Sequence, residues 1–125
     1  MSAEGALSVL VVDDDAALLS VAARTLARHA DVTTASSAAA ARELLATRNF
    51  DIVVSDFAMP GEDGLSLLAY VREQYPDTLL VLFSGADIDK GEVAAEAGLI
   101  HHAVPKSTGY RQLTEVIRTH PKVRP

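Results

Sequence analysis

The sequence predicts an α/β fold in which helices cover both faces of a five-stranded parallel sheet. Five short apolar runs recur along the chain, and each is followed by a segment with apolar residues at helical spacing. The runs lack the polar alternation of a strand with one solvent-facing side, which is typical of parallel sheets. With 125 residues, 49% of them hydrophobic, the chain has enough apolar side chains to bury one core.

Three of the expected strands lie in the first half of the chain, at residues 7–12, 32–35 and 52–55. Ser36 or Ser37 can cap the helix that follows the second strand. The apolar stripes of the first two helices are formed by Leu19, Ala22, Ala23 and Leu26, and by Ala41, Leu44 and Leu45.

The second half supplies two more strands, at residues 79–83 and 100–104. The third helix is expected to stop near Pro76, and Gly98 closes the fourth. The stripes of the last three helices contain Leu65, Leu68 and Ala69, then Val93, Ala94 and Ala97, then Leu113, Val116 and Ile117. We expect a domain over residues 7–119, with an N-terminal extension at 1–6 and a tail or linker at 120–125.

The composition excludes several classes of partner and site. Asp and Glu number 17 against 11 Lys and Arg, and a formal net charge of −6 argues against a nucleic-acid or anionic-membrane surface. Without cysteine the chain has neither disulfides nor thiolate metal ligands. No secretory signal or run of about 20 apolar residues is present, so we expect a cytoplasmic domain.

Two of the strands end abruptly in acidic residues. The run at 9–12 is followed by Asp13, Asp14 and Asp15, and the run at 52–55 by Asp56. In a parallel sheet these carboxylates gather at one edge, where they repel one another unless a divalent cation neutralises them. Their oxygens are the ligands that Mg²⁺ prefers, and Mn²⁺ is an alternative. The sequence therefore predicts a hard-metal site.

The same edge carries residues suited to phosphoryl transfer. A carboxylate such as Asp56 can attack phosphorus and form an aspartyl phosphate once a metal offsets the repulsion between the two anions. Ser84 and Lys106, which also follow strands, can supply a hydroxyl and an ammonium to the phosphoryl oxygens.

Each of these residues also has a purely structural interpretation. Acids before a helical stripe often cap the helix, a role we assign to Asp15. Ser84 precedes a glycine and could be an ordinary turn residue, while loop lysines such as Lys106 are usually solvated. His101 and His102 could suggest a metal site, but adjacent strand residues point to opposite faces, so we leave both out.

Four segments resemble the response-regulator receiver domain of two-component signalling: VVDDD near the start, SDFAMPGEDG around Asp56, FSGAD at 83–87 and PKS around Lys106. The resemblance implies a flavodoxin-like (βα)₅ fold with strand order 2-1-3-4-5. It also implies a switch phosphorylated by a sensor histidine kinase or histidine phosphotransfer protein. Such a domain acts on an output domain or downstream protein, as a monomer or weak homodimer, and catalyses only its own phosphorylation and dephosphorylation.

The resemblance assigns a role to each candidate residue. Asp56 is the phosphoacceptor, Asp14 a direct Mg²⁺ ligand and Asp13 a partner that acts largely through water. The backbone carbonyl of Ala58 is a further ligand. Ser84 matches the switch hydroxyl and Lys106 the lysine that pairs with phosphate.

Two positions depart from the family pattern. Ser107 stands where the family usually has a proline after the lysine, so we expect a trans Lys106–Ser107 bond and a reshaped loop. Ala103 stands where the family carries Tyr or Phe, which predicts an output face that responds differently to phosphorylation. Phosphorylation of Asp56 and signalling by the output face are therefore separate questions.

Two other functions compete with a phosphorylatable receiver. A degenerate receiver would serve only as a protein-binding module. A haloacid-dehalogenase-like hydrolase also uses a strand-terminal Asp and Mg²⁺, but its D-x-D-x-[TV] motif is incomplete at residues 13–17, and the short chain leaves no room for a substrate cap.

Overall fold

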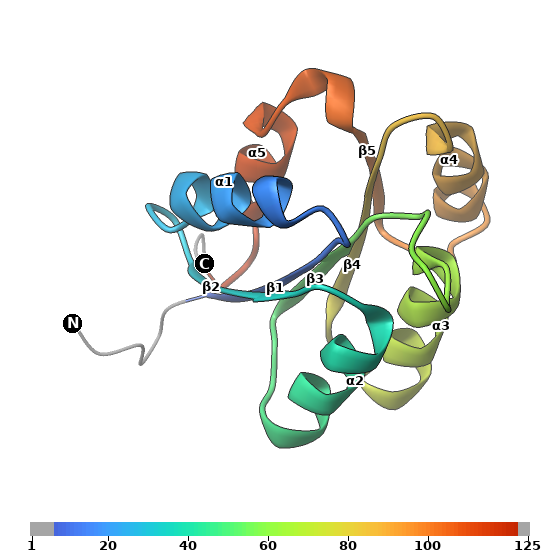
Figure 1. Ribbon diagram of the computed structural model, residues 1–125, viewed down its shortest axis with the longest axis horizontal. Helices are drawn as coiled ribbons and strands as arrows, with labels where there is room; N and C mark the ends of the chain where they lie inside the picture. The colour runs from blue at the N-terminus through green and yellow to red at the C-terminus, as the bar shows by residue number, and fades with distance from the viewer. Residues whose placement is uncertain (1–6, 123–125) are drawn as a thin grey trace.

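The computed structural model describes residues 7–122, in which strands and helices alternate along the chain (Figure 1). The elements are β1 (Ser8–Val12), α1 (Ala16–Leu26), β2 (Asp31–Ala35), α2 (Ala38–Thr47), β3 (Ile52–Ser55), α3 (Gly64–Gln74), β4 (Leu79–Ser84), α4 (Ile88–Glu96), β5 (His102–Pro105), the 3₁₀ helix η1 (Lys106–Thr108) and α5 (Arg111–Arg118). The N-terminal extension expected at 1–6 and the end of the expected tail at 123–125 lie outside the described residues.

The five strands form one parallel sheet in the order β2-β1-β3-β4-β5, which confirms the expected fold class and strand order. β1 and β3 are in register at their carboxyl ends, where Val12 pairs with Ser55. β4 and β5 end together in the same way, with Ser84 opposite Pro105. This register brings the residues that follow each strand to one edge of the sheet.

Each face of the sheet is covered by its own helices, α1 and α5 on one side and α2, α3 and α4 on the other (Figure 1). Alternate residues of each strand point to opposite faces. In β1, Val9 and Val11 pack under α1 and α5, whereas Leu10 and Val12 pack under the other three helices. The central strands are therefore buried on both sides, which explains their uninterrupted apolar sequences.

Polar side chains cap three of the helices at their N-termini. Asp15 accepts hydrogen bonds from the amides of Ala17 and Leu18, which confirms its expected capping role. At α2 the cap is Ser37, the second of the two serines considered, and at α3 it is Asp63. These caps satisfy amides that have no partner within the helix.

The fifth strand was expected at residues 100–104 but spans His102–Pro105. The difference comes from His101, whose backbone amide donates to the carbonyl of Leu80 while its Nδ1 accepts from the amide of Leu80 at 2.9 Å. An imidazole thus takes the hydrogen bond that a strand carbonyl would accept, and ladder pairing begins at His102, two residues after the expected start. Nδ1 of this histidine is therefore engaged in a hydrogen bond within the fold.

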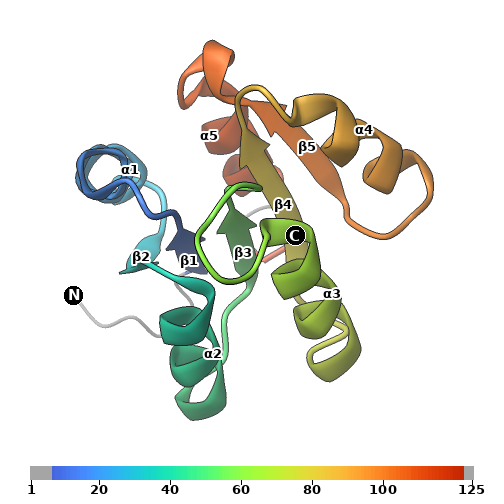
Figure 2. The same cartoon turned by 45° about the vertical axis from the view of Figure 1, so that its right-hand side comes forward.

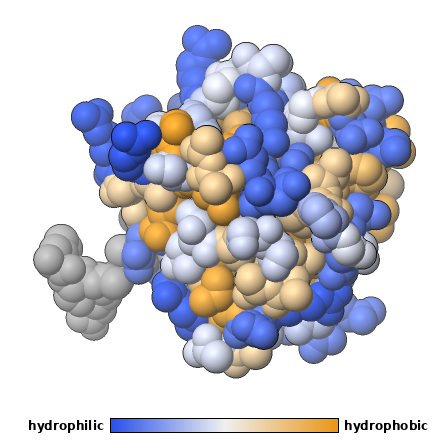
Figure 3. Space-filling model, viewed as in Figure 1, coloured by the Kyte–Doolittle hydropathy of each residue, from blue (hydrophilic) through white to orange (hydrophobic). Residues whose placement is uncertain are grey.

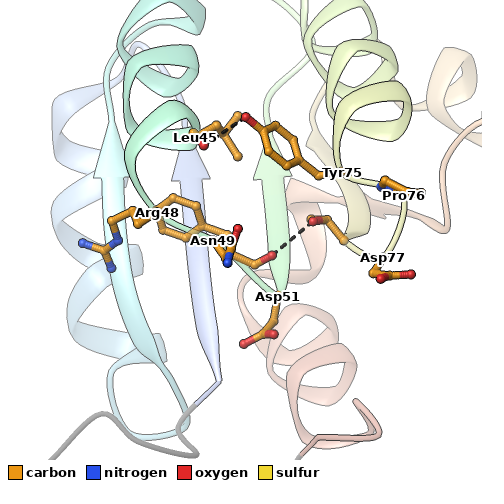
Figure 4. A pocket seen from close by; sticks show the side chains of 9 residues that line it. Leu45, Arg48, Asn49, Asp51, Tyr75, Pro76 and Asp77 are labelled. Carbon is orange, nitrogen blue, oxygen red and sulfur yellow. Dashed lines mark hydrogen bonds between the residues drawn. The ribbon is translucent and has the colours of Figure 1, made fainter.

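Asp51 links both ends of the described chain at the amino edge of the sheet. Its Oδ2 accepts from the amide of Ser8 at 2.8 Å and from Nζ of Lys122 at 3.0 Å. A hollow of about 340 Å³ lies beside it, between the C-terminal ends of α2 and α3 (Figure 4). The hydroxyls of Tyr75 and Thr78 at its wall already donate to backbone carbonyls, so they act as structural groups.

The surface is mixed in polarity. On the face shown in Figure 3, hydrophobic residues lie in small groups separated by hydrophilic ones. Among the described residues, the exposed large hydrophobic side chains are Val21, Val93 and Leu99. No helix within residues 7–122 combines the length and apolar character needed to cross a membrane.

Candidate functional site

Three carboxylates meet at the carboxyl edge of the sheet. Because Val12 and Ser55 are paired, the residues that follow them, Asp13 and Asp56, leave neighbouring strands side by side. Asp13, Asp14 and Asp56 each offer one carboxylate oxygen, and these oxygens lie within 4.8 Å of one another. The structure therefore brings together the acids that the sequence placed at one edge.

The three acids differ in their surroundings. The side chain of Asp13 is buried, and its Oδ1 accepts from the amide of Asp15 at 2.9 Å, which fixes its orientation. Asp14 is exposed, and Asp56 is half-buried. The cluster thus has a rigid floor and an open side, as a site that admits both a cation and a second reactant requires.

Lys106 lies between two of the carboxylates. Its Nζ is 2.9 Å from Oδ2 of Asp13 and 3.4 Å from Oδ2 of Asp56. Burial alone would lower the pKa of Lys106, but the contacts with Asp13 and Asp56 outweigh it and raise the pKa above its usual value. This lysine is therefore a persistent cation at the site.

Asp56 is held in place by its own backbone neighbour, since its Oδ1 accepts from the amide of Phe57 at 2.8 Å. Burial raises the pKa of Asp56 above its usual value, and the nearby charge of Asp13 adds to this effect. Lys106 and the Phe57 amide oppose the shift without cancelling it. The ionised carboxylate is therefore less stable here than in water, and it would gain from an additional positive charge.

The remaining predicted residues lie at the same edge. Ser84 is buried as the last residue of β4, and Lys106 opens η1 directly after β5. Ala58 belongs to the loop between β3 and α3, which curves past the ends of the central strands in Figure 2. No cis peptide bond is present within residues 7–122, so the Lys106–Ser107 bond is trans as expected.

Gly64, the first residue of α3, packs against the backbone of Asp56. A Cβ at this position would fall on the carbonyl oxygen of Asp56, 2.8 Å from its carbonyl carbon and 2.9 Å from Oγ of Ser55. The buried Ser55 hydroxyl donates to the same carbonyl at 2.9 Å. The start of α3 therefore packs directly against the backbone of Asp56. No local feature of the sequence predicts this contact.

Glu62, which follows Gly61 in the loop between β3 and α3, forms an ion pair with Arg42 of α2. The guanidinium donates from Nε to Oε1 at 3.1 Å and from Nη2 to Oε2 at 2.6 Å. The two partners are 20 residues apart in the sequence and belong to different elements. The sequence around either residue therefore does not predict this pair.

Ala103 allows α4 to approach the sheet closely. A Cβ on Gly91 of α4 would lie 3.1 Å from the Cβ of Ala103 and 2.5 Å from Cδ2 of Leu82. The small residues at 91 and 103 therefore face each other. An aromatic ring at 103 directed toward α4 would collide with this helix.

The protein-family comparison identifies the chain. The family model described as the response regulator receiver domain matches residues 9–118. The chain belongs to this family. As a receiver domain, it is the part of a response regulator that operates in two-component signalling, and the match covers every element of the site from Asp13 to Lys106. The family match favours this assignment over the haloacid-dehalogenase alternative.

Curated relatives of the receiver domain are transcriptional and response regulators. The Hydrogenase transcriptional regulatory protein HoxA of Cupriavidus necator is 35% identical over 76% of this chain. The DNA-binding transcriptional regulator NtrC of Escherichia coli K12 is 34% identical over 78%, and the Response regulator protein FleR of Pseudomonas aeruginosa is 36% identical over 92%. The chain spans only 20%, 21% and 24% of the length of these three proteins.

Solved structures agree with this assignment. The signal receiver domain of an HD domain-containing protein from Pseudomonas fluorescens Pf-5 superposes with a TM-score of 0.83 and 28% identity, covering 94% of this chain and 95% of that one. A response regulator receiver domain protein from Clostridium thermocellum, at 22% identity, shares the fold with a TM-score of 0.82 and covers 94% of both chains.

Proposed function

We propose that this receiver domain accepts a phosphoryl group on Asp56, in a Mg²⁺-dependent reaction, from a histidine of a sensor kinase or phosphotransfer protein. The observation that carries the proposal is the convergence of Asp13, Asp14 and Asp56, with Lys106 in contact with two of them. Three carboxylates beside one lysine leave an excess of negative charge. Such a cluster is suited to a cation and an incoming phosphoryl group.

The side chains fit a hard divalent cation. Each of the three acids offers a carboxylate oxygen within 4.8 Å of the others, compatible with sites on one octahedral ion that keeps room for water. In our proposal Asp14 and Asp56 bind Mg²⁺ directly, Asp13 acts largely through water, and the Ala58 carbonyl completes the protein ligands. Bound there, Mg²⁺ would supply positive charge that offsets the repulsion between Asp56 and the phosphoryl group.

Asp56, Lys106 and Ser84 have different roles in the phosphoryl transfer. A carboxylate oxygen of Asp56 forms the bond to phosphorus while the bond from phosphorus to the donor's histidine nitrogen breaks. Lys106, already in contact with Asp56, balances charge on the phosphoryl oxygens, and the Ser84 hydroxyl donates a hydrogen bond to one of them. Drawing Ser84 and Lys106 toward the phosphoryl group would shift the nearby α4–β5–α5 surface, which gives the switch its output.

The test is incubation with acetyl phosphate and Mg²⁺, followed by intact-mass measurement. We expect one phosphoryl adduct that is absent in Asp56→Asn and in the presence of a chelator. No adduct under these conditions, together with no effect of beryllofluoride on the wild-type protein, would contradict the proposal. That outcome would favour a degenerate receiver that acts only as a binding module.

A further inference from the structure

The loop between β3 and α3 is held mainly by side chains in its central part. Within residues 7–122, no backbone hydrogen bond outside the helices and strands involves residues 58–62. At its two ends the loop is fixed, because the amide of Asp56 donates to Val12 and the amide of Gly64 donates to Phe57 at 2.7 Å. The segment between these points includes Ala58, the proposed backbone ligand.

Glu62 provides the polar anchor of this segment. Besides its two hydrogen bonds from Arg42, it accepts one from Oγ of Ser66 at 3.0 Å. A hollow of about 270 Å³ separates the start of α2 from Pro60 and Gly61, so close packing does not hold the loop on that side. The ion pair spans the same gap and ties the loop to α2.

Arg42 is itself held in one orientation. Its guanidinium lies over the ring of Tyr70 in α3, 4.0 Å from the ring centroid. That ring meets Tyr75 edge-on at 6.4 Å between centroids. A forked, stacked guanidinium loses less freedom on pairing than a lysine would, and it matches the two oxygens of a carboxylate. Arg42 lowers the pKa of Glu62, chiefly through their hydrogen bonds, so the pair stays ionised at neutral pH.

We propose that Arg42 is a positioning residue for the metal site: by holding Glu62, it keeps the loop that carries Ala58 in the conformation that binds Mg²⁺. This role rests on the proposed Mg²⁺ site and adds α2, an element outside the acidic cluster, to the structure that forms it. Residues that orient metal ligands from behind typically influence metal affinity without touching the ion.

The test is calorimetric titration of the unphosphorylated domain with MgCl₂, for the wild type, Arg42→Gln and Glu62→Gln. We expect the dissociation constant for Mg²⁺ to rise about fivefold in each variant, as suits the loss of one bidentate, partly exposed pair. Removing a cation should by charge alone strengthen Mg²⁺ binding, whereas removing an anion should weaken it. A rise in both variants therefore separates positioning from long-range electrostatics.

Two further variants complete the experiment. Tyr75→Phe deletes a hydroxyl that links α3 to Leu45 of α2, so it perturbs the same helices without touching the loop, and its Mg²⁺ affinity should match the wild type. Arg42→Lys keeps the charge but not the fork, and should recover only part of the affinity.

The outcomes separate this inference from the proposed function. If Arg42→Gln and Glu62→Gln bind Mg²⁺ within twofold of the wild type, or shift in opposite directions, the positioning role is wrong. A wild type that binds no Mg²⁺ would overturn it together with the metal site. A wild type that binds Mg²⁺ but takes no phosphate on Asp56 would contradict the proposed function alone, and the affinities of the variants would still decide the role of Arg42.

Discussion

Replacing Gly64 with alanine should damage both the stability of the domain and its acceptor site. The added methyl would meet the backbone carbonyl of Asp56 well inside 3.0 Å, a separation that real Cβ atoms essentially never show. Neither partner can escape by changing rotamer, so α3 and the end of β3 must separate by about 1 Å. Overpacking of this kind costs about 3 kcal/mol. Alanine also lowers the conformational entropy of the unfolded chain, which offsets up to about 1 kcal/mol of this cost. The free energy of unfolding should therefore fall by about 2 kcal/mol.

Thermal unfolding followed by circular dichroism measures this loss. For a domain of this size we expect the midpoint to fall by about 8 °C. Gly85→Ala is the matched control, since its Cβ would have no neighbour within 4 Å and its φ is not positive, and it should gain about 0.5 kcal/mol. Phosphorylation of Gly64→Ala by acetyl phosphate should also be slower, because the contact acts on Asp56 itself. If the two variants unfolded at the same temperature, the close approach of α3 to Asp56 would not be a feature of the protein in solution.

Three other predictions concern stability. In chelator, Asp56→Asn should be more stable than the wild type at neutral pH, because burial and a neighbouring carboxylate raise the pKa of Asp56 and make its ionisation unfavourable to folding. In urea titrations, the difference in unfolding free energy between the variant and the wild type should be complete above the raised pKa of Asp56. It should disappear as the pH falls below the pKa of an aspartate in the unfolded chain. Ala103→Phe should cost about 2 kcal/mol in the same titrations, since a ring would crowd Gly91; an unchanged midpoint would show that α4 yields freely. Thr78→Val keeps the side-chain volume but removes the hydrogen bond to the Phe50 carbonyl, and should lower the unfolding free energy by about 1 kcal/mol; no change would mean that water replaces the hydroxyl.

The hydropathy pattern predicted the fold well, because few folds other than a parallel sheet between two layers of helices bury both faces of short apolar strands. All five apolar runs became strands, and the acids after β1 and β3 met because strand ends in register share an edge. The start of β5 was misplaced because a side chain, His101, replaced a backbone partner, and strand propensity contains no information about such a substitution. The four other strands begin and end within one residue of the predicted positions.

The candidate site was predictable to the extent that its residues follow strands. Asp13 and Asp56 are of this kind, and so is Lys106. The supports behind them depend on contacts between distant elements: Gly64 against the Asp56 carbonyl, and Arg42 against Glu62. A glycine in a sequence does not show what lies where its side chain would be, and a charged residue on a helix does not show its partner. Both contacts arise only when distant parts of the chain meet in the fold.

The double contact at Asp51 also determines how the domain can be joined to other proteins. Ser8 and Lys122 meet on one carboxylate at the amino edge, whereas the acidic cluster occupies the carboxyl edge. β3 separates Asp51 from Asp56, a distance of about 15 Å along an extended strand. Ser8 and Lys122 therefore lie at the opposite pole of the sheet from the acidic cluster. A reporter or a neighbouring domain fused directly before Ser8 or directly after Lys122 would leave the approach of a phosphodonor sterically open, and insertion of residues 8–122 into a surface loop of another protein would need only a narrow gap.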